Sequence, residues 1–218
     1  MSKELKKRVV TSILLLMIAI LCIVISKIIF TFAIFIIFAI CFYEWDNINT
    51  PYFFIKRKKK RFFLIQLAGS FYLFIFLASS IYIYNSISEI FFIYIILICV
   101  CSDMGGYIFG KMIGGKKLTK ISPNKTIAGS VGSFIFSIVP LFLFNFKNYQ
   151  DVSLSLKHTL FCLVISLSCQ LGDLIISYFK RLNKVKDTGN ILPGHGGLLD
   201  RIDGIIFAIP ITCILKVA

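Results

Sequence analysis

The sequence predicts an all-α fold, a polytopic integral membrane protein with about seven transmembrane helices. Of its 218 residues, 58% are hydrophobic and 16% are charged, whereas a soluble domain is about half apolar and roughly a quarter charged. So few polar side chains cannot cover that much apolar surface in water, which excludes a soluble globular fold. The same composition excludes disorder. The apolar residues also fall into long runs with basic clusters between them.

Seven of these runs approach the roughly 20 residues that a helix needs to cross a bilayer. In chain order they are residues 9–26, 28–43, 62–84, 90–112, 126–146, 158–179 and 198–217. The first run has no small-residue cleavage site, so a retained helix is expected rather than a signal peptide. Only Lys27 separates it from the second run, which predicts a tight or partly re-entrant hairpin. We therefore expect an N-terminal transmembrane hairpin and basic loop over residues 1–61, and a C-terminal transmembrane domain over residues 62–218.

The formal net charge of +14, from 24 Lys and Arg against 10 Asp and Glu, first suggests nucleic-acid binding. However, 20 of the 24 basic residues form four clusters between the apolar runs, within residues 3–8, 56–61, 111–125 and 180–201. Cytoplasmic loops of membrane proteins carry such an excess. With seven spans and a cytoplasmic N-terminus, all four clusters lie on the cytoplasmic side. The expected partner is therefore the lipid bilayer, to whose anionic surface each cation contributes about 1 kcal/mol, and not nucleic acid.

The cysteines and the single tryptophan are expected to have structural roles. All seven cysteines lie inside predicted spans and none forms a CxxC pair, which is typical of small buried hydrophobic side chains. Trp45, beside Glu44, is expected to be an interfacial anchor.

Four carboxylates are predicted at similar depth, near the cytoplasmic ends of three spans. Asp103 and Asp173 lie eight and seven residues before the basic ends of their spans, roughly 10–12 Å below the helix end. Asp200 and Asp203 lie one turn apart at the start of the last span. Charges inside spans are costly and are therefore functional by default. The alternative, strongest for Asp103, is that each one only pairs with a neighbouring Lys or Arg.

Carboxylates beside cations and glycines at a membrane surface are typical of metal-bound phosphate chemistry. Mg²⁺ takes one or two carboxylates together with substrate phosphates and water. Lys and Arg neutralise the other phosphate oxygens, and glycines let backbone N–H groups approach them. The segment LPGHGG at residues 192–197 has this character. Within it, His195 is expected to donate to a phosphate or to act as an acid.

The central loop, residues 102–126, offers a second candidate site. Gly106, Gly110 and Gly114 recur every four residues, which favours close helix packing over ligand binding. Residues 105–111 imitate a Walker A loop, but Met112 follows where Ser or Thr is needed, so a P-loop is excluded. Thr126 or Ser122 could cap the next helix, whose N-terminal N–H groups could hold a phosphate. A plain cap beside solvated lysines stays an equal alternative.

Several motifs then recur in a recognisable order. They are Glu44-Trp45, then Asp103, Tyr107, Gly110 and Ser122-Pro123-x-Lys125-Thr126-x-x-Gly129, then Gln170-x-Gly172-Asp173, Ser177-Tyr178-Phe179-Lys180-Arg181, Lys186-Asp187 and LPGHGGLLDRID at 192–203. Together they resemble the signature of the phosphatidate cytidylyltransferase (CDP-diacylglycerol synthase) family over most of the chain. Asn124, where the family commonly has a second Lys, and Ile127-Ala128, in place of Trp-Glu, depart from the pattern.

The resemblance implies transfer of CMP from CTP to phosphatidic acid, giving CDP-diacylglycerol and pyrophosphate in phospholipid biosynthesis, with Mg²⁺ as cofactor. It implies metal ligation by Asp173, Asp200 and Asp203. The catalytic residues that it implies are Asp173, Lys186, His195, Asp200, Arg201 and Asp203. The implied substrate-binding residues are Ser122, Lys125, Thr126, Lys180, Arg181, Gly194, Gly196 and Gly197. Asp187 would orient a lysine or a second cation.

The resemblance also implies a catalytic pocket at the cytoplasmic side of the C-terminal helices and assembly as a homodimer. The chain's size and its basic, phenylalanine-rich composition favour the bacterial inner membrane.

Two other classes of function remain for comparison. A transporter or flippase of an anionic lipid or nucleotide would explain intramembrane Asp residues, but it predicts charges spread toward the membrane midplane. A CDP-alcohol phosphotransferase needs Asp-Gly-x-x-Ala-Arg, whereas Asp203-Gly204 is followed by Ile-Ile-Phe-Ala, so this class is excluded. A non-enzymatic scaffold would not need the His-Gly-Gly loop.

Overall fold

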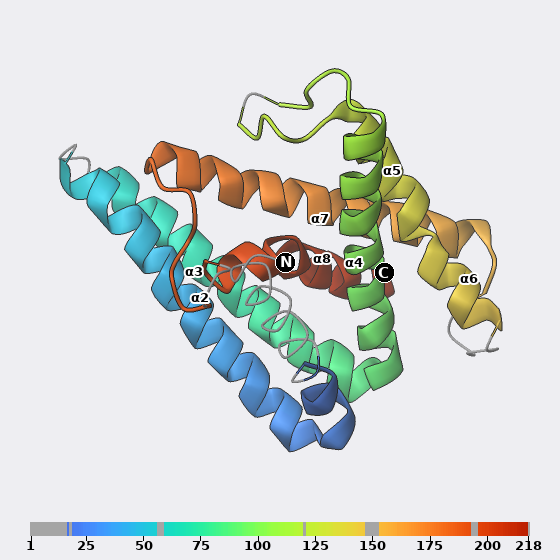
Figure 1. Ribbon diagram of the computed structural model, residues 1–218. Helices are drawn as coiled ribbons and strands as arrows, with labels where there is room; N and C mark the ends of the chain where they lie inside the picture. Colours follow the sequence, from blue (N-terminus) through green and yellow to red (C-terminus); the bar gives the residue numbers. More distant parts are fainter. Residues whose placement is uncertain are drawn as a thin grey trace. The chain divides into compact units, whose positions relative to one another are not determined.

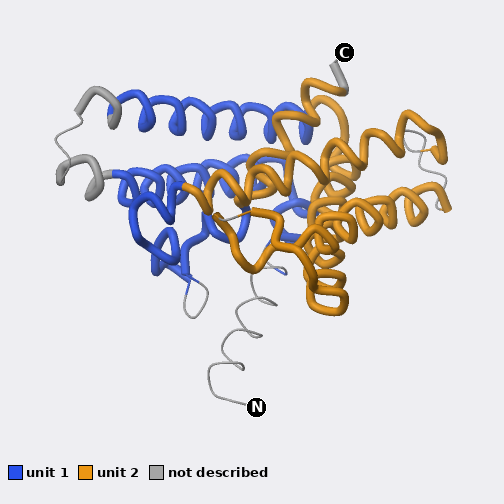
Figure 2. The backbone as a smooth tube through the Cα atoms, turned by 90° about the horizontal axis from the view of Figure 1, so that it is seen from above, with its two compact units in different colours: residues 1–85, 179–202 blue, residues 86–178, 203–218 orange. Residues whose placement is uncertain are grey.

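The computed structural model describes residues 17, 19–55, 59–119, 121–146, 153–192 and 196–217. In this part of the chain every regular element is a helix, and the two β-bridges, Lys117 with Thr126 and Leu192 with Gly196, are isolated (Figure 1). The predicted all-α class is therefore confirmed. The chain divides into two compact units, one of residues 1–85 and 179–202 and the other of residues 86–178 and 203–218 (Figure 2).

Unit 1 is built on the helical pair α2 (Lys27–Ile55) and α3 (Lys59–Tyr82), which run side by side (Figure 1). Residues 19–25 are also helical, and the chain turns at Ser26. The Ser26 hydroxyl accepts the Ile28 N–H at 3.3 Å, so it caps α2. The turn agrees with the expected hairpin, although residues 9–16 and 18 of its first arm lie outside the described residues.

A π-helical segment, η1 (Ile83–Ile87), follows α3, and its Tyr84 packs against the first described helices of unit 1. The Tyr84 ring stacks on Phe30 with ring centroids 3.8 Å apart. Its hydroxyl donates to the Ile23 carbonyl at 2.5 Å. One residue of η1 thus holds both the first helical turns and α2.

Trp45 differs from the expectation of an interfacial anchor. It is 5% exposed, and its indole fills the space beside Gly69 on α3, where a side chain on Gly69 would overlap it. Its ring also meets Phe179 edge to face, with centroids 4.8 Å apart. Trp45 is therefore a packing residue between α2 and its neighbours, because its large ring finds a glycine-sized gap there.

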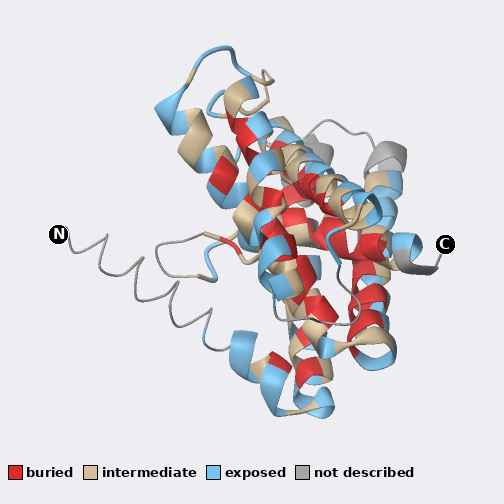
Figure 3. Ribbon diagram, turned by 90° about the vertical axis from the view of Figure 1, so that its right-hand side faces the viewer, coloured by how far each residue is buried: buried red, intermediate tan, exposed pale blue. Residues whose placement is uncertain are grey.

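Unit 2 holds α4 (Glu89–Met112), α5 (Ile127–Ser137), α6 (Val139–Phe146) and most of α7 (Leu156–Leu182) and α8 (Leu199–Val217). The Ser88 side chain accepts the Ile90 N–H and caps α4. The expected single span 126–146 is two helices, because the chain breaks at Ile138 and Pro140 has no N–H to continue the ladder. Buried and exposed residues alternate along the helices (Figure 3).

Glycines bring α4 and α5 into close contact. A Cβ on Gly129 would lie 2.8 Å from the Gly106 carbonyl oxygen, and one on Gly110 would touch Gly129 Cα at 3.7 Å. The predicted packing role is thus confirmed for Gly106 and Gly110. It is wrong for Gly114, where a Cβ would meet no described atom within 4 Å. Gly114 has a φ of 64° just beyond the end of α4, where a left-handed residue often ends a helix.

Five helical segments in the described part of the chain are long and apolar enough to cross a membrane. They are Lys27–Asn49, Phe63–Ile87, Glu89–Met112, Ile127–Phe146 and Leu156–Leu182. Helix α8 is not among them, since Asp200, Arg201 and Asp203 occupy its first turns. Most of the run 9–26 lies outside the described residues, so the seven-span topology stays a prediction. The predicted division into an N-terminal region, residues 1–61, and a C-terminal domain, residues 62–218, also stays a prediction, because the two compact units do not test it.

Candidate functional site

A cavity of about 340 Å³ lies within unit 2, between α4, α5, α7 and the loop that leads into α5. Most of the residues around it are polar or charged, and two are glycines. The lining residues are Asp103, Gly106, Tyr107, Leu118, Ser122, Asn124, Lys125, Thr126, Gly129, Ser130, Ser133, Gln170 and Asp173. Three predicted substrate-binding residues, Ser122, Lys125 and Thr126, and one predicted metal ligand, Asp173, therefore share one cavity.

The N-terminus of α5 lies at this cavity. Thr126 is the N-cap, and its hydroxyl oxygen accepts the Gly129 N–H at 3.0 Å. The Ile127 N–H donates to the Lys116 carbonyl at 3.0 Å, and the Leu118 N–H donates to the Lys125 carbonyl at 2.8 Å. These bonds fix the backbone on either side of Lys125. Of the two expected caps, Thr126 is confirmed, whereas Ser122 lies in the preceding turn and accepts the Lys125 N–H through its carbonyl.

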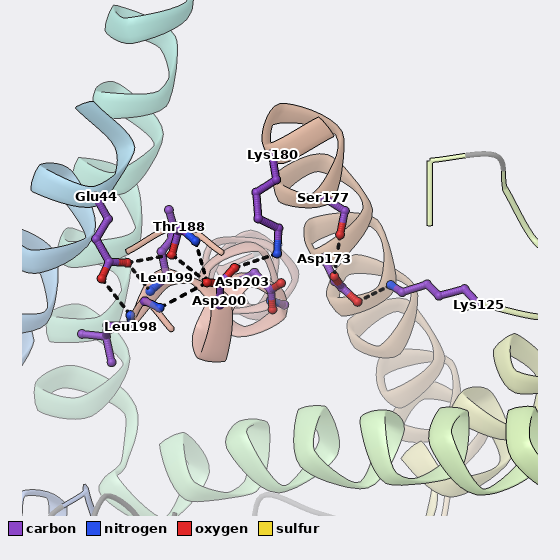
Figure 4. A network of polar contacts seen from close by, with 12 residues as sticks. Glu44, Lys125, Asp173, Ser177, Lys180, Thr188, Leu198, Leu199, Asp200 and Asp203 are labelled. Carbon is purple, nitrogen blue, oxygen red and sulfur yellow. Dashed lines mark hydrogen bonds and ion pairs between the residues drawn. The ribbon is translucent and has the colours of Figure 1, made fainter. Parts of the chain in front are cut away.

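Lys125 and Asp173 form an ion pair in the cavity wall (Figure 4). The Asp173 carboxylate also accepts the Ser177 hydroxyl at 3.2 Å, one turn further along α7. The carboxyl group of Asp203 on α8 interacts directly with that of Asp173. Helices α7 and α8 come this close because Gly172 lies against Asp203, where a Cβ would be 2.7 Å from its carbonyl oxygen. Two facing carboxyl groups need a proton or a cation between them.

Asp103 lies on α4 at the same cavity but makes no ion pair with any described residue. Its Oδ1 accepts only the Cys169 thiol, at a Sγ–O distance of 3.7 Å. At the preceding residue, a hydrogen bond between the hydroxyls of Ser102 and Ser166, at 2.8 Å, links α4 to α7. Among the described residues Asp103 thus differs from Asp173 and Asp200, which pair with lysines.

Unit 1 contains a second polar cluster, centred on Asp200 in the first turn of α8 (Figure 4). Its Oδ1 accepts Lys180 Nζ at 2.6 Å. Its Oδ2 accepts the Thr188 N–H at 2.7 Å, the Thr188 hydroxyl at 3.0 Å and the Gly197 N–H at 3.2 Å. With its side chain only 6% exposed, Asp200 joins the end of α7 and the loop 183–198 to α8.

Glu44 completes this cluster from α2. Its Oε1 accepts the Leu198 N–H at 2.9 Å. Its Oε2 accepts the Leu199 N–H at 2.8 Å and the Thr188 hydroxyl at 2.9 Å. The backbone donors at the start of α8 are thus bound by two carboxylates of the chain itself. The N–H of Gly197, predicted to approach a substrate phosphate, donates to Asp200.

The remaining predicted site residues of unit 1 face outward or fall outside the described ranges. Arg181, Lys186 and Arg201 are exposed. Gly196 has a φ of 84°, a conformation that favours glycine. His195 and Gly194 lie outside the described residues, so their predicted roles stay predictions.

The acidic residues suit a hard cation only in part. Among the described residues, no group of three or more His, Cys, Asp or Glu side chains has the arrangement of a metal site. Mg²⁺, however, usually takes only one or two protein carboxylates and completes its shell with phosphate oxygens and water. The facing Asp173 and Asp203 carboxyl groups fit this pattern. Asp200 fits it less well, since both of its oxygens already accept hydrogen bonds.

Sequence reasoning did not assign roles to Glu44, Thr188 or Gln170. Glu44 and its partner Thr188 lie 144 residues apart, so no local pattern could pair them. Gln170 begins the motif Gln170-x-Gly172-Asp173, and its Oε1 accepts the Ser130 hydroxyl at 2.5 Å, so it links α7 to α5. The one available signal for Glu44 was its place in the Glu44-Trp45 motif, directly after the predicted span 28–43.

Comparison with known proteins places this site in a family. A model of the cytidylyltransferase family matches residues 50–217. The phosphatidate cytidylyltransferase of Staphylococcus aureus (strain COL) is 48% identical over 130 residues, which are 58% of this chain and 49% of the relative. Those of Staphylococcus haemolyticus (strain JCSC1435) and Staphylococcus saprophyticus (strain ATCC 15305) are 45% identical over 130 residues and 44% identical over 129, with the same shares of both chains. The chain spans about half the length of these curated relatives. The matched region contains the whole cavity, the Asp200 cluster apart from Glu44, and every predicted site residue, and the chain belongs to the cytidylyltransferase family.

Proposed function

We propose that this protein is a phosphatidate cytidylyltransferase, which transfers CMP from CTP to phosphatidic acid and yields CDP-diacylglycerol and pyrophosphate. The observation that carries the proposal is the cavity of unit 2, where Lys125 and the capped N-terminus of α5 face the acidic residues Asp103 and Asp173. A phosphate needs such donors, and its metal ion needs such acids. The names of the staphylococcal relatives support the same reaction.

The phosphates of CTP are proposed to bind at the α5 end of the cavity. Helix N-termini favour anions through the helix dipole, and Lys125 supplies a full positive charge. The N–H groups of Ile127 and Gly129 already donate within the chain, so the dipole and Lys125 provide most of the proposed attraction. Lys125 pairs with Asp173 in the cavity wall. Binding of a phosphate would let Lys125 turn from the carboxylate to the phosphate oxygens, which releases Asp173.

Asp173 and Asp203 are the residues that would hold Mg²⁺, with Asp200 one turn before Asp203 on α8 as a third candidate. Bound Mg²⁺ would neutralise the phosphate charges and stabilise the leaving pyrophosphate. A second cation, near Asp187, stays a prediction.

The reaction itself is a phosphoryl-type transfer. An oxygen of the phosphatidate phosphate forms a bond to the α-phosphorus of CTP, and the bond from that phosphorus to the bridging oxygen breaks. The bridging oxygen keeps the electron pair and leaves as part of pyrophosphate. Little covalent chemistry is required of the protein, so positioning and charge neutralisation supply most of the rate.

The basic residues of unit 1 are proposed to bind phosphate groups. Lys180 is held by Asp200 at 2.6 Å, while Arg181, Lys186 and Arg201 are exposed. Gly194, Gly196 and Gly197 are proposed to shape the same loop, and His195 to donate to a phosphate or act as an acid.

The apolar helices and the bacterial relatives support an integral membrane protein. We further propose the bacterial inner membrane, a cytoplasmic active site and a homodimer. A transporter or flippase of an anionic substrate is not favoured, because the relatives are named as transferases.

The direct test is an assay of purified full-length protein with labelled CTP, phosphatidate and Mg²⁺. Formation of labelled CDP-diacylglycerol with equimolar pyrophosphate is the expected result. Lys125→Met, with its uncharged side chain, is expected to lose most of the activity. If thermal denaturation shows that the protein is folded and it still forms no product, the proposed function is refuted.

A further inference from the structure

Glu44 is a buried carboxylate that forms no ion pair with any lysine or arginine in the described part of the chain. It is 1% exposed, and the two ion pairs found among the described residues are Lys125 with Asp173 and Lys180 with Asp200. A buried charge is costly unless hydrogen bonds replace its lost water. Glu44 accepts three such bonds, from the Thr188 hydroxyl and from the N–H groups of Leu198 and Leu199.

The loop after α7 is shaped to receive this carboxylate. A Cβ on Gly189 would lie 2.8 Å from Glu44 Oε1, and a Cβ on Gly197 would lie 2.5 Å from Oε2. Real Cβ atoms essentially never come so close to another heavy atom. Any side chain at either position would therefore displace Glu44, the loop or both. Gly189 and Gly197 thus permit the contact between α2 and the start of α8.

Thr188 connects Glu44 to Asp200. Its hydroxyl oxygen lies 2.9 Å from Glu44 Oε2 and 3.0 Å from Asp200 Oδ2. A hydroxyl has one proton, so it donates to one of the two carboxylates at a time. The Thr188 N–H donates to Asp200 in addition, at 2.7 Å. Asp200 in turn holds Lys180 at 2.6 Å.

We propose that Glu44 is a positioning residue, which acts through Thr188 and the first N–H groups of α8 to fix Asp200 and Lys180 in the geometry that turnover requires. This inference rests on the proposed function, because it assigns Asp200 and Lys180 to that reaction. Glu44 itself would touch neither substrate nor metal. Its carboxylate would accept the hydrogen bonds of the first N–H groups of α8, so these groups would not bind a substrate phosphate, which would bind to other donors.

The kinetic test compares variants of nearly equal shape in the purified full-length protein. Glu44→Gln puts an amide N–H₂ where one carboxylate oxygen accepts, and Thr188→Val removes only the hydroxyl. Each is expected to lower kcat at least tenfold, whereas Thr188→Ser, which keeps the hydroxyl, stays within twofold of wild type. Asp46→Asn is the matched control, since Asp46 is an exposed acid on the same helix, and it is expected to change kcat less than twofold.

The combination of Glu44→Gln with Thr188→Val should lower kcat no further than the worse single variant, because both remove the same link. A role in packing alone predicts the opposite pattern, with Thr188→Val near wild type because valine fills the same space. That pattern, or normal kcat in Glu44→Gln, would overturn the inference.

A second measurement does not depend on activity. Amide hydrogen exchange in the substrate-free protein should quicken at Thr188, Leu198 and Leu199 in Glu44→Gln, and stay unchanged in α4 and α5. Unchanged exchange at those three amides would overturn the inference even if activity fell. If the wild type makes no CDP-diacylglycerol, the proposed function fails, and with it the claim that Glu44 serves turnover. Local exchange would then report only whether Glu44 holds the segment.

Discussion

The glycine contact between α4 and α5 allows a matched pair of substitutions. A Cβ on Gly132 would lie 2.7 Å from the Gly105 carbonyl oxygen and 2.5 Å from Phe109 Cβ. A Cβ on Gly110 would meet nothing nearer than the Thr126 hydroxyl oxygen, at 3.4 Å. Gly132→Ala and Gly110→Ala thus add the same methyl group to the same helix pair, one into a clash and the other into ordinary contact.

The difference in stability between the two variants isolates the clash. Both gain about 1 kcal/mol of helix propensity, which cancels in the comparison. A backbone oxygen and a Cβ cannot rotate away, so α4 and α5 must separate by several tenths of an ångström in Gly132→Ala. Overpacking of this kind costs about 1–3 kcal/mol. Since 1 kcal/mol moves Tm by about 2–4 °C in proteins of this size, Gly132→Ala should melt about 2–12 °C below Gly110→Ala.

The assay is thermal denaturation of both variants and wild type in one detergent, followed by CTP binding. Separation of α4 from α5 would also widen the cavity that they line, so Gly132→Ala should bind CTP more weakly, while Gly110→Ala binds it as wild type does. Equal melting temperatures for the two alanine variants would refute the close packing of α4 on α5.

Three further predictions concern the proposed site. Asp203→Asn should abolish formation of CDP-diacylglycerol while the protein still inserts and folds, and near-normal activity would remove Asp203 from the metal site. Thr126→Ala should raise the KM for CTP about 2- to 30-fold, the equivalent of the 0.5–2 kcal/mol that an N-cap contributes. Thr126→Ser, which keeps the hydroxyl, should leave the KM unchanged. Equal KM values for Thr126→Ala and wild type would show that the cap does not contribute to nucleotide binding. Removal of divalent cations with EDTA should abolish turnover and also the thermal stabilisation by CTP, and added Mg²⁺ should restore both. Stabilisation that survives EDTA would mean that CTP binds without a metal.

Helix positions near strong local signals could be predicted closely. Residues 90–112 were expected to form a span, and α4 runs Glu89–Met112, because a mainly apolar run lies between the Ser88 cap and Gly114. Thr126 was one of two expected caps, and the structure selects it. Gly106 and Gly110 follow a four-residue spacing that places both on one helix face. These features depend on residues within a few turns of one another.

Features that depend on tertiary neighbours could not be predicted. Trp45 has the sequence position of an interfacial anchor, and only Gly69, on the next helix, makes it a packing residue. The lysine partners of Asp173 and Asp200 follow from the fold, since nothing in the order of the residues tells which cation reaches which acid.

The candidate site shows the same limit. Motif resemblance found Asp173, Lys125 and Thr126, which the cavity does bring together. It also grouped Asp200 with the metal ligands, although in the structure Asp200 accepts four hydrogen bonds from Lys180, Thr188 and Gly197. A conserved-looking acid can serve a metal or hold a loop, and only its hydrogen-bond partners distinguish the two roles.

The contacts of Glu44 have a consequence for biosynthesis. Its partners lie 144 to 155 residues later in the chain. At translation rates of about 5–20 residues per second, α2 enters the bilayer roughly 7–30 seconds before these partners are made. During that interval its carboxylate has none of its final donors, although Glu44 lies inside the candidate span Lys27–Asn49, where an unsolvated charge is costly. The second half of the chain therefore relieves a penalty that the first half incurs on insertion.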